Sequence, residues 1–333
     1  MKGRDLAPEV IDIRQFNAQA FEHLLDAESA AWDAALHWDY TPARRLISSC
    51  LDEKRISGYA LVEEGRITGY SFFFYEGEKG LIGSLFMAPD GDPLEPALLL
   101  LQHVIETLLA TPALRRVETQ LPHYALEQLE PCFRAHGFDC FLRRFMVLPL
   151  SPGGPATTSY SATENRRGRA QASPPGGFQF LPWEGKHDRG AAEIILSAYR
   201  GHIDAQINDQ YGSLAGAARL VDNIMRQHGC GDVLPDASLV AIHRATEKLA
   251  GVVALTAVRA RTAHIPQIAV AREFQGMDLG SRLMEASFRE AARHGYEEVT
   301  LTVTDLNAGA VRFYDRLGFH TLRTFGAFVW EAR

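Results

Sequence analysis

The chain repeats a set of landmarks across its middle, and this repeat strongly limits the folds that it can adopt. Gly69 and Gly251 each open a β-rich apolar run and lie 182 residues apart. Further pairs are Leu85-Phe86-Met87-Ala88 with Gln267-Ile268-Ala269-Val270 at the same offset, and Gly137-Phe138 with Gly318-Phe319 at an offset of 181. A nearly constant offset between several landmarks indicates duplication. We therefore expect two domains that share one fold.

A low-complexity segment separates the two halves. Residues 151–177 are rich in Gly, Pro, Ser, Thr and Ala and nearly lack large aliphatic side chains. Such a segment cannot bury enough apolar surface to order itself, which predicts a flexible linker. The expected organisation is a first domain at 1–150, the linker at 151–177, and a second domain at 178–333.

Composition excludes several classes of protein. A formal net charge of -7 gives no support for nucleic-acid binding, which normally needs a basic surface. No apolar run reaches the 18 residues that a membrane span requires, and no secretory leader follows Met1, so we expect a cytoplasmic protein with no membrane partner. The four cysteines lack metal-ligand spacing, so we expect free thiols and no metal site.

Each half has the same coarse order of predicted elements. Helices are expected over about 17–55 and 187–228, followed by strands with turns at 63–66 and 245–248. A central strand, a helix, a strand, a helix and a final strand follow. This order predicts an α+β fold in each half, with a mixed, mostly antiparallel sheet flanked by helices.

The loop from Gln275 to Ser281 is the strongest candidate binding motif. It follows the apolar run Ile265–Val270 and opens an amphipathic helix that Gly295 ends. A short glycine-containing loop before a helix leaves backbone N–H groups unpaired, and such groups bind phosphate well. An ordinary connection between a strand and a helix is the alternative for this loop taken alone.

A second motif follows the next predicted strand, Val299–Val303. The pattern Gln-x-x-x-x-Gly, then helix and strand, then Asn-x-x-Ala-x-x-Phe-Tyr-x-x-x-Gly-Phe from Asn307 to Phe319, resembles the GNAT superfamily of acyl-CoA-dependent N-acyltransferases. The resemblance is specific over roughly 238–325. It implies two tandem GNAT-like domains, each with a parallel strand pair that splays at the acyl-CoA site.

The resemblance also implies roles for individual residues. Strand residues would pair with the pantetheine arm, loop residues would hold the pyrophosphate, and Tyr314 would protonate the departing thiolate. The implied acyl-CoA contacts are Ile268, Ala269, Val270, Gln275, Gly276, Met277, Asp278, Leu279, Gly280, Ser281, Asn307 and Phe313. A phenol beside a thioester can supply the proton that the sulfur needs, and a strand N–H can polarise the carbonyl. The alternative for Tyr314 is a packed ring whose hydroxyl bonds a neighbour.

Asp278 departs from the family pattern, which usually has a glycine at this position. Aspartate tolerates the left-handed conformation, so the turn can form. Its carboxylate would either oppose a diphosphate or cap the following helix.

The base that deprotonates the amine is less well defined. In several relatives a carboxylate lies four residues ahead of the pantetheine-pairing stretch, where this chain has His264. Asp305 is a second candidate, although it could cap the following helix, and an exposed histidine at a strand start is the alternative for His264. The polar segment from His202 to Tyr211 is expected to contribute to acceptor recognition.

The first half lacks the residues that the chemistry requires. Its loop, Asp90–Pro96, carries two prolines without N–H groups and three carboxylates, and the offset places Phe133 opposite Tyr314 and Leu126 opposite Asn307. We expect a degenerate copy that serves stability, shapes the substrate cleft or forms dimer contacts.

The expected function is transfer of an acetyl group from acetyl-CoA to a primary amine of a small molecule or peptide. Two alternatives stay open. One is a tandem acyltransferase with another acyl group or a thiol-precursor substrate, and the other is a non-catalytic acyl-CoA sensor or interaction module. A homodimer stays open as well.

Overall fold

In the computed structural model, the chain forms two compact units. The structure describes residues 8–89, 94–150, 177–227 and 229–332. The first unit extends to Phe145 and also includes Thr304–Leu306 and the chain from Leu322 onward. The second unit comprises Met146–Val303 and Asn307–Thr321. The predicted linker at 151–177 lies almost entirely outside the described residues.

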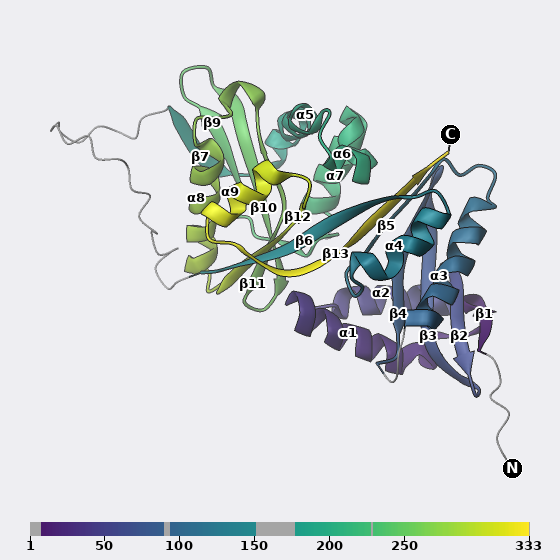
Figure 1. The fold of residues 1–333 in the computed structure, drawn as a ribbon. Helices are drawn as coiled ribbons and strands as arrows, with labels where there is room; N and C mark the ends of the chain where they lie inside the picture. Colours follow the sequence, from purple (N-terminus) through teal and green to yellow (C-terminus); the bar gives the residue numbers. More distant parts are fainter. Residues whose placement is uncertain (1–7, 90–93, 151–176, 228, 333) are drawn as a thin grey trace, which may run out of the picture. The chain divides into compact units, whose positions relative to one another are not determined.

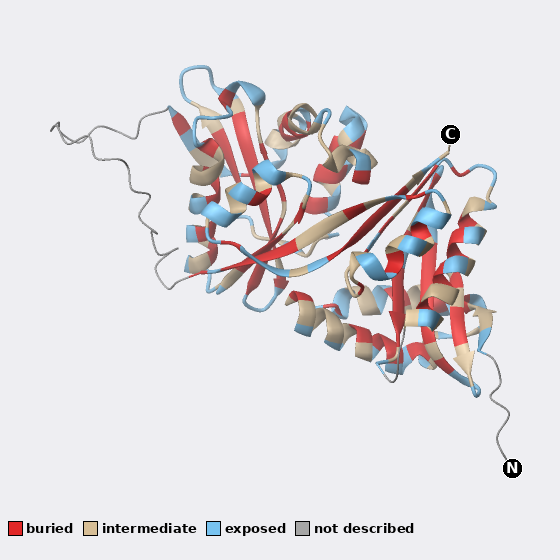
Figure 2. Ribbon diagram, viewed as in Figure 1, coloured by how far each residue is buried: buried red, intermediate tan, exposed pale blue. Residues whose placement is uncertain are grey.

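The first unit is an α+β layer structure (Figure 1). Its elements are β1 (Glu9–Asp12), α1 (Glu22–Leu36), α2 (Thr41–Asp52), β2 (Ser57–Glu63), β3 (Arg66–Glu76), β4 (Lys79–Met87), α3 (Leu94–Leu109), β5 (Arg116–Leu121), α4 (Leu126–Ala135) and the start of β6 (Asp139–Pro149). Residues of α3 and α4 pack in one apolar cluster with the sheet, and residues of α1 and α2 pack in another. The sheet therefore has helices on both faces, and its strands are largely buried (Figure 2).

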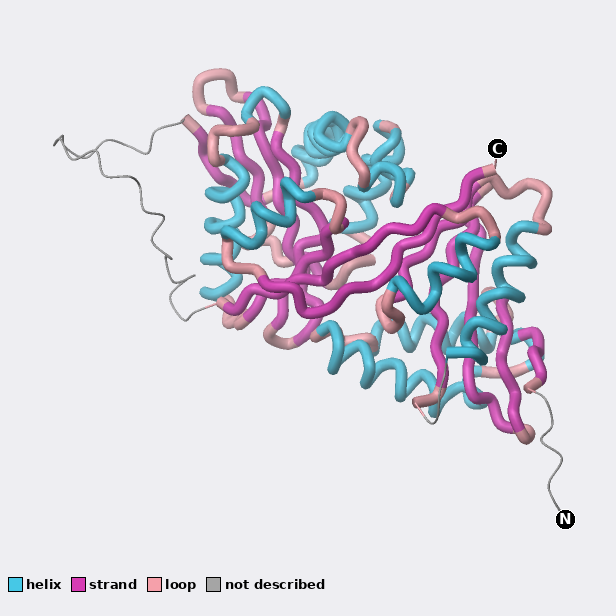
Figure 3. The backbone as a smooth tube through the Cα atoms, in the orientation of Figure 1, coloured by secondary structure: helices cyan, strands magenta, loops and turns pink. Residues whose placement is uncertain are grey.

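The second unit repeats this arrangement. Its elements are β7 (Phe178–Pro182), α5 (Asp188–Tyr199), α6 (Asp204–Ile207), α7 (Leu214–Met225), β8 (Asp232–Val233), β9 (Leu239–His243), β10 (Lys248–Arg259), β11 (Thr262–Val270), α8 (Leu279–Arg293), β12 (Glu298–Thr304), α9 (Ala308–Arg316) and the start of β13 (His320–Glu331). Apolar residues of α8 and α9 form one core with the sheet, and those of α5 and α7 form the other. Figure 3 shows the alternation of helices and strands along the trace.

Local sequence explains several of these elements. The turn between β2 and β3 consists of Glu64 and Gly65, both with positive φ, as a tight hairpin requires. On α8, the apolar side chains Leu279, Leu283, Met284 and Phe288 are buried on one face, as their spacing predicts. The predicted α+β class, mixed sheet and flanking helices are all present in both units.

The final strand of each unit comes from the other half of the sequence. In the first unit, the C-terminal part of β13 pairs antiparallel with β5, from Gly326 opposite Leu121 to Glu331 opposite Arg116. In the second unit, the end of β6 lies next to β12. The sequence placed 178–333 in one domain and 1–150 in the other. The structure instead assigns residues from Leu322 onward to the first unit and Met146–Leu150 to the second.

The structure also corrects the register of the internal repeat. Gly69 pairs with Met87, and Gly251 pairs with Val270, so Val270 corresponds to Met87 at an offset of 183. The extra residue lies in a bulge between Ala257 and Arg259 of β10. In this register, Gln267 corresponds to Ser84.

Helix ends correct one more predicted correspondence. Asn307 is the N-cap of α9, and the N-cap of α4 is Ala125, so Asn307 corresponds to Ala125 and not to Leu126. Phe133 does correspond to Tyr314, because Phe138 N donates to Phe133 O just as Phe319 N donates to Tyr314 O.

Within the part of the chain that the structure describes, none of the helices combines the length and the apolar character of a membrane span.

Candidate active site

The two parallel strands of the second unit separate halfway along their length. The pairing of β11 with β12 runs from Thr262 opposite Glu298 to Ile265 opposite Leu301. Beyond this point β11 continues to Val270 without a β12 partner. One edge of β11 is therefore open, and alternate backbone groups along it are available to an extended ligand.

A β-bulge lies where β11 and β12 stop pairing. Ala254 pairs with Gln267 and Thr256 pairs with His264, so β11 carries one residue more than β10 over this stretch. Bulges bend a strand and re-aim its side chains. The extra residue falls at Ile265 and Pro266, and Pro266 has no N–H to donate to the ladder. Ile268, Ala269 and Val270 then form the open edge, where the sequence placed the pantetheine contacts.

The predicted phosphate loop connects this open strand to α8. Gly276 has φ +77° and Asp278 has φ +58°, so both adopt the left-handed conformation, and α8 begins at Leu279. The Gln275 side chain donates to Val270 O at 3.1 Å and ties the loop to the strand end. Gln275, Gly276, Met277 and Asp278 are all exposed. An exposed turn at a helix N-terminus is well suited to bind an anion.

The structure decides the local role of Asp278. Its side chain makes no capping hydrogen bond to α8, so the capping alternative is wrong. The expectation that aspartate would tolerate the left-handed turn is confirmed by its φ.

Helix α9 packs directly against the start of α8. A Cβ placed on Gly280 would lie 3.5 Å from Phe313 Cζ and 3.9 Å from Val270 Cγ2, so these three predicted contacts are neighbours. Asn307 Oδ1 accepts from Ala310 N at 3.1 Å and caps α9. The ring of Tyr314 is half-buried, with centroids 5.3 Å from Phe313 and 5.7 Å from Phe319.

His264 lies in an environment that suits packing better than base catalysis. The residue is buried, and its Nδ1 is 3.0 Å from Thr300 Oγ1 on the neighbouring strand. Burial lowers the pKa of His264 to about 3. A neutral imidazole with so low a pKa is a weak acceptor for the proton of an ammonium group. The surroundings of His264 therefore disfavour the predicted role, and the alternative, an exposed histidine at a strand start, is not observed either.

Asp305 is held by an ion pair. Its carboxylate accepts from Arg144 Nε at 2.6 Å, and its backbone N–H donates to Leu142 O. Capping of α9 belongs to Asn307, so the expectation that Asp305 could cap this helix is wrong.

A polar network beside the open edge was not recognised as a unit from the sequence. Gln267 is 2% exposed, and its side chain accepts from the Tyr211 hydroxyl at 3.0 Å and donates to the Tyr199 hydroxyl at 3.1 Å. The two tyrosine rings are stacked, with centroids 4.0 Å apart. The available signal was a single glutamine within the apolar run Ile265–Val270.

The corresponding place in the first unit holds a buried carboxylate, Glu28. Ser84 donates to Glu28 Oε1 at 2.6 Å, and Tyr70 donates to the other carboxylate oxygen. Glu28 is 1% exposed, and desolvation raises its pKa. Pairing of β4 with β5 also ends early, at Ile82 opposite Thr119, so the splay exists in both units. Residues 90–93 of the first unit's loop lie outside the described residues.

Among the residues that the structure describes, no group of three or more His, Cys, Asp and Glu side chains could hold a metal ion.

Comparisons with known proteins agree with this geometry. Residues 208–319 match the family model of the acetyltransferase (GNAT) family. No curated protein sequence matches the chain significantly. The family match thus covers most of the second unit and, apart from Thr304–Leu306, leaves the first unit outside it.

Solved structures match along the whole chain. The chain is similar to a GCN5-related N-acetyltransferase from Sphaerobacter thermophilus, with a TM-score of 0.64, 17% identity, and coverage of 97% of this chain and 95% of that one. It is also similar to a tandem GNAT protein from the clavulanic acid biosynthesis pathway, with a TM-score of 0.60, 16% identity, and coverage of 98% and 99%. A glucosamine N-acetyltransferase region of a fungal multi-domain β-N-acetylglucosaminidase matches with a TM-score of 0.59, 13% identity, and coverage of 97% and 38%. At these identities the likeness concerns the fold.

Proposed function

We propose that the chain is a tandem GNAT acetyltransferase with a degenerate N-terminal copy, and that its second unit transfers an acetyl group from acetyl-CoA to a primary amine of a small molecule or a peptide. The observation that carries the proposal is the open edge of β11, which leads through a positive-φ turn into α8. A pantetheine-like arm can pair with such an edge, and a diphosphate can bind at such a helix start.

The proposed role of each residue follows from its position in the site. Backbone N–H groups of Ile268 to Val270 would bind the pantetheine and polarise the thioester carbonyl. Backbone N–H groups of Gln275 to Ser281 would hold the pyrophosphate. Asn307 fixes the start of α9, and Phe313 packs at Gly280, so Tyr314 is carried on a helix anchored to the phosphate loop.

The acid step follows from where charge develops. When the amine attacks the thioester carbon, the C–S bond breaks and the sulfur leaves as a thiolate. Tyr314 would supply the proton that this sulfur needs. The first unit has Phe133 at the corresponding position, fully buried and stacked on Phe328. It therefore lacks the proton donor, which supports a single catalytic unit per chain.

Binding is tested with the full chain. Calorimetric titration of acetyl-CoA should give one site per chain. Ser281→Glu places a negative charge in the first turn of α8, so it should lower the affinity at least about tenfold, whereas Ser281→Ala should leave it nearly unchanged. Two acetyl-CoA sites of equal affinity per chain, or an equal loss of affinity in both Ser281 variants, would contradict the placement of the acyl-CoA site in the second unit.

Catalysis is tested by release of free thiol from acetyl-CoA in the presence of a panel of primary amines. Amine-dependent release is the expected result. Tight binding of acetyl-CoA without release from any amine would identify a sensor, and release only with thiol or other acyl substrates would identify the tandem acyltransferase alternative.

A further inference from the structure

The side chain of Gln267 is 2% exposed and makes three hydrogen bonds. Its Nε2 donates to Ile268 O at 3.0 Å and to the Tyr199 hydroxyl at 3.1 Å, and its Oε1 accepts from the Tyr211 hydroxyl at 3.0 Å. A carbonyl oxygen can only accept, so the contact with Ile268 O fixes which end of the amide carries the nitrogen. Both N–H groups of the amide are therefore used, and the direction of each bond is determined.

One of these bonds lies on the open edge of β11. Ala271 N donates to Ala250 O on β10, and the pairing with β10 is regular back to Ile268. Backbone groups alternate in direction along an antiparallel strand, so the N–H and C=O groups of Ile268 and Val270 point away from β10, toward the side where β12 has separated. Gln267 thus contacts the backbone segment to which the proposed function assigns the thioester carbonyl.

The other two bonds hold the segment 199–211, which includes the predicted acceptor-recognition residues, against this strand. Tyr199 is the last residue of α5, and Tyr211 lies in a short turn before α7. Their rings are stacked, with centroids 4.0 Å apart, and pack in one apolar cluster with Ala269 of β11. Both ends of the segment therefore meet at the single amide of Gln267.

A second bond supports the same docking. Arg272, two residues past the end of β11, donates to Arg200 O at 3.0 Å. This bond is exposed to solvent, whereas the amide of Gln267 is buried. A buried polar group that loses its partners costs more free energy than an exposed one, so Gln267 is the stronger of the two links.

The first unit provides an internal comparison. Trp32 and Tyr40 form a similar stacked pair there, with centroids 5.0 Å apart. The residue that corresponds to Gln267 is Ser84, whose hydroxyl donates to Glu28. A hydroxyl has one hydrogen, so Ser84 cannot also donate to a neighbouring carbonyl as Gln267 does. The link from an aromatic pair to the outward carbonyl therefore distinguishes the unit to which catalysis is assigned.

We propose that Gln267 is a positioning residue of the acetyl transfer, which holds the tyrosine pair at the distance from Ile268 at which a bound amine reaches the thioester carbonyl. This inference rests on the proposed function, since Ile268 N–H is one of the groups assigned to the acyl-CoA. The amide takes no proton and forms no bond to the substrate. It fixes the geometry between two binding surfaces, and an error of about 1 Å in such geometry can lower a rate about 10²-fold.

Gln267→Met tests this role, because methionine is also unbranched and makes none of the three bonds. In the full-length chain, kcat/KM for the best amine of the panel should fall at least about tenfold. The affinity for acetyl-CoA, measured by calorimetry, should stay within about twofold of the wild type, because the backbone groups of the open edge are unchanged. A general loss of structure would instead lower both quantities together.

Tyr211→Phe is a second variant, which keeps the stacked ring. It removes the donor to Gln267 Oε1 and leaves that buried oxygen without this partner. Because both substitutions break the same bond, the double variant should lose little more kcat/KM than Gln267→Met alone. Losses that multiply in the double variant would show that the two residues act independently and would contradict the proposal.

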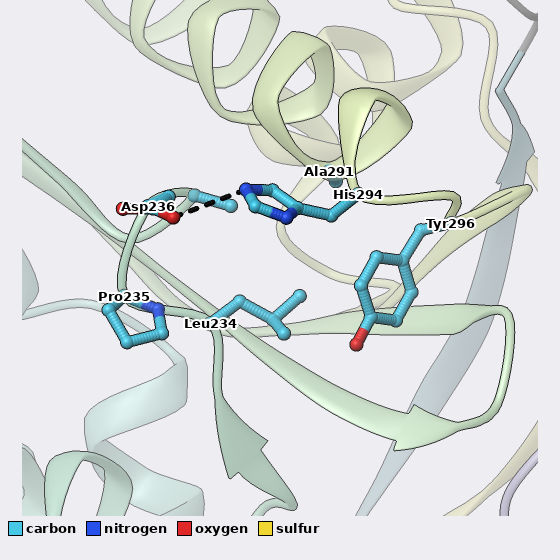
Figure 4. Close-up of a pocket in the computed structure, with 7 residues that line it drawn as sticks. Leu234, Pro235, Asp236, Ala291, His294 and Tyr296 are labelled. Atoms are coloured by element: carbon cyan, nitrogen blue, oxygen red, sulfur yellow. Dashed lines mark ion pairs between the residues drawn. The ribbon is translucent and has the colours of Figure 1, made fainter.

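Tyr296 offers a matched control within the same unit. It lines the hollow just past the C-terminal end of α8, where His294 pairs with Asp236, about 20 Å along the helix from the phosphate loop (Figure 4). Tyr296→Phe also removes one tyrosine hydroxyl and keeps the ring. It should leave both kcat/KM and the affinity for acetyl-CoA unchanged.

Circular dichroism would verify that each variant is folded. A folded Gln267→Met variant with wild-type kcat/KM, or with equal losses in kcat/KM and in acetyl-CoA affinity, would overturn the positioning role and leave the proposed function intact. If Gln267→Met does not fold, Tyr211→Phe decides alone: a lower kcat/KM with unchanged acetyl-CoA affinity supports the role, and wild-type kinetics overturn it. A wild-type protein that binds acetyl-CoA and acetylates no amine would overturn the proposed function, and this inference with it.

Discussion

At the scale of single residues, Tyr314 carries the clearest chemical prediction. Tyr314→Phe keeps the ring that packs against Phe313 and Phe319 and removes only the hydroxyl. We expect kcat to fall about 10²-fold or more, because the thiolate loses its proton donor, with little change in acetyl-CoA affinity. Steady-state kinetics and calorimetry measure the two quantities. An unchanged kcat under conditions where chemistry limits the rate would make Tyr314 a packing residue.

The burial of His264 leads to a prediction of how the free energy of unfolding depends on pH. Its pKa is about 3 in the folded chain and near 6.5 when unfolded, so the unfolded state binds the proton first as pH falls. The contribution of the neutral imidazole to the free energy of unfolding is complete above pH 6.5 and is lost progressively between pH 6.5 and 3. We expect this residue to account for about 1.5 kcal/mol of the stability lost between pH 6.5 and 5.

Urea unfolding at several pH values measures this effect. His264→Gln should show a smaller loss of stability on acidification than the wild type, whereas a substitution at exposed His294 should not. Parallel pH profiles for the wild type and His264→Gln would show that the buried imidazole is not the group that titrates.

At the scale of elements, the proposed function makes the loop and the start of α8 one anion-binding unit, in which Asp278 would be the unfavourable member. The side chain makes no capping hydrogen bond, so we expect its charge to oppose a bound diphosphate. Asp278→Gly and Asp278→Asn both tolerate φ +58° and both remove the charge. Each should tighten acetyl-CoA binding by up to about fivefold, since solvent screens the repulsion.

The two substitutions control for each other. Tightening in the glycine variant alone would point to backbone freedom as the cause. Weaker binding in both variants would mean that Asp278 contributes to the acyl-CoA site by a contact that outweighs its charge. Melting temperatures measured without ligand should change little in either variant.

At the scale of the whole molecule, the exchange of terminal strands makes the C-terminus part of the first unit's core. Phe328 on β13 is 0% exposed and stacks on Phe133, with centroids 3.8 Å apart. Phe328→Ala should destabilise the chain by about 3–5 kcal/mol, because it leaves a cavity in that core. Amide exchange in β5, the partner of β13, should accelerate.

Leu322→Ala on the same strand provides the control, because Leu322 is 37% exposed and should change stability far less. A loss below about 1 kcal/mol for Phe328→Ala, or faster exchange confined to the second unit, would contradict the assignment of β13 to the first unit's core. Because the two units exchange their terminal strands, a chain cut at the predicted linker would leave each unit without its last strand. Binding experiments therefore need the full chain.

The sequence by itself determined the local features of this protein. The hairpin at Glu64 and Gly65, the left-handed positions in the loop before α8, and the buried face of that helix all follow from residues close together in the chain. Backbone conformation and helix periodicity depend on neighbours within a few positions, so the α+β class and the loop could be predicted.

Only the tertiary structure decided which residues meet across the fold. The burial of His264, the hydrogen bonds of Gln267 with Tyr199 and Tyr211, and the membership of β13 in the first unit depend on segments that are distant in sequence. A side chain's pKa depends on how fully its neighbours exclude water, and a strand's partner depends on which sheet edge is free. Neither quantity is encoded in a local pattern, which is why the candidate bases and the domain division required the folded chain.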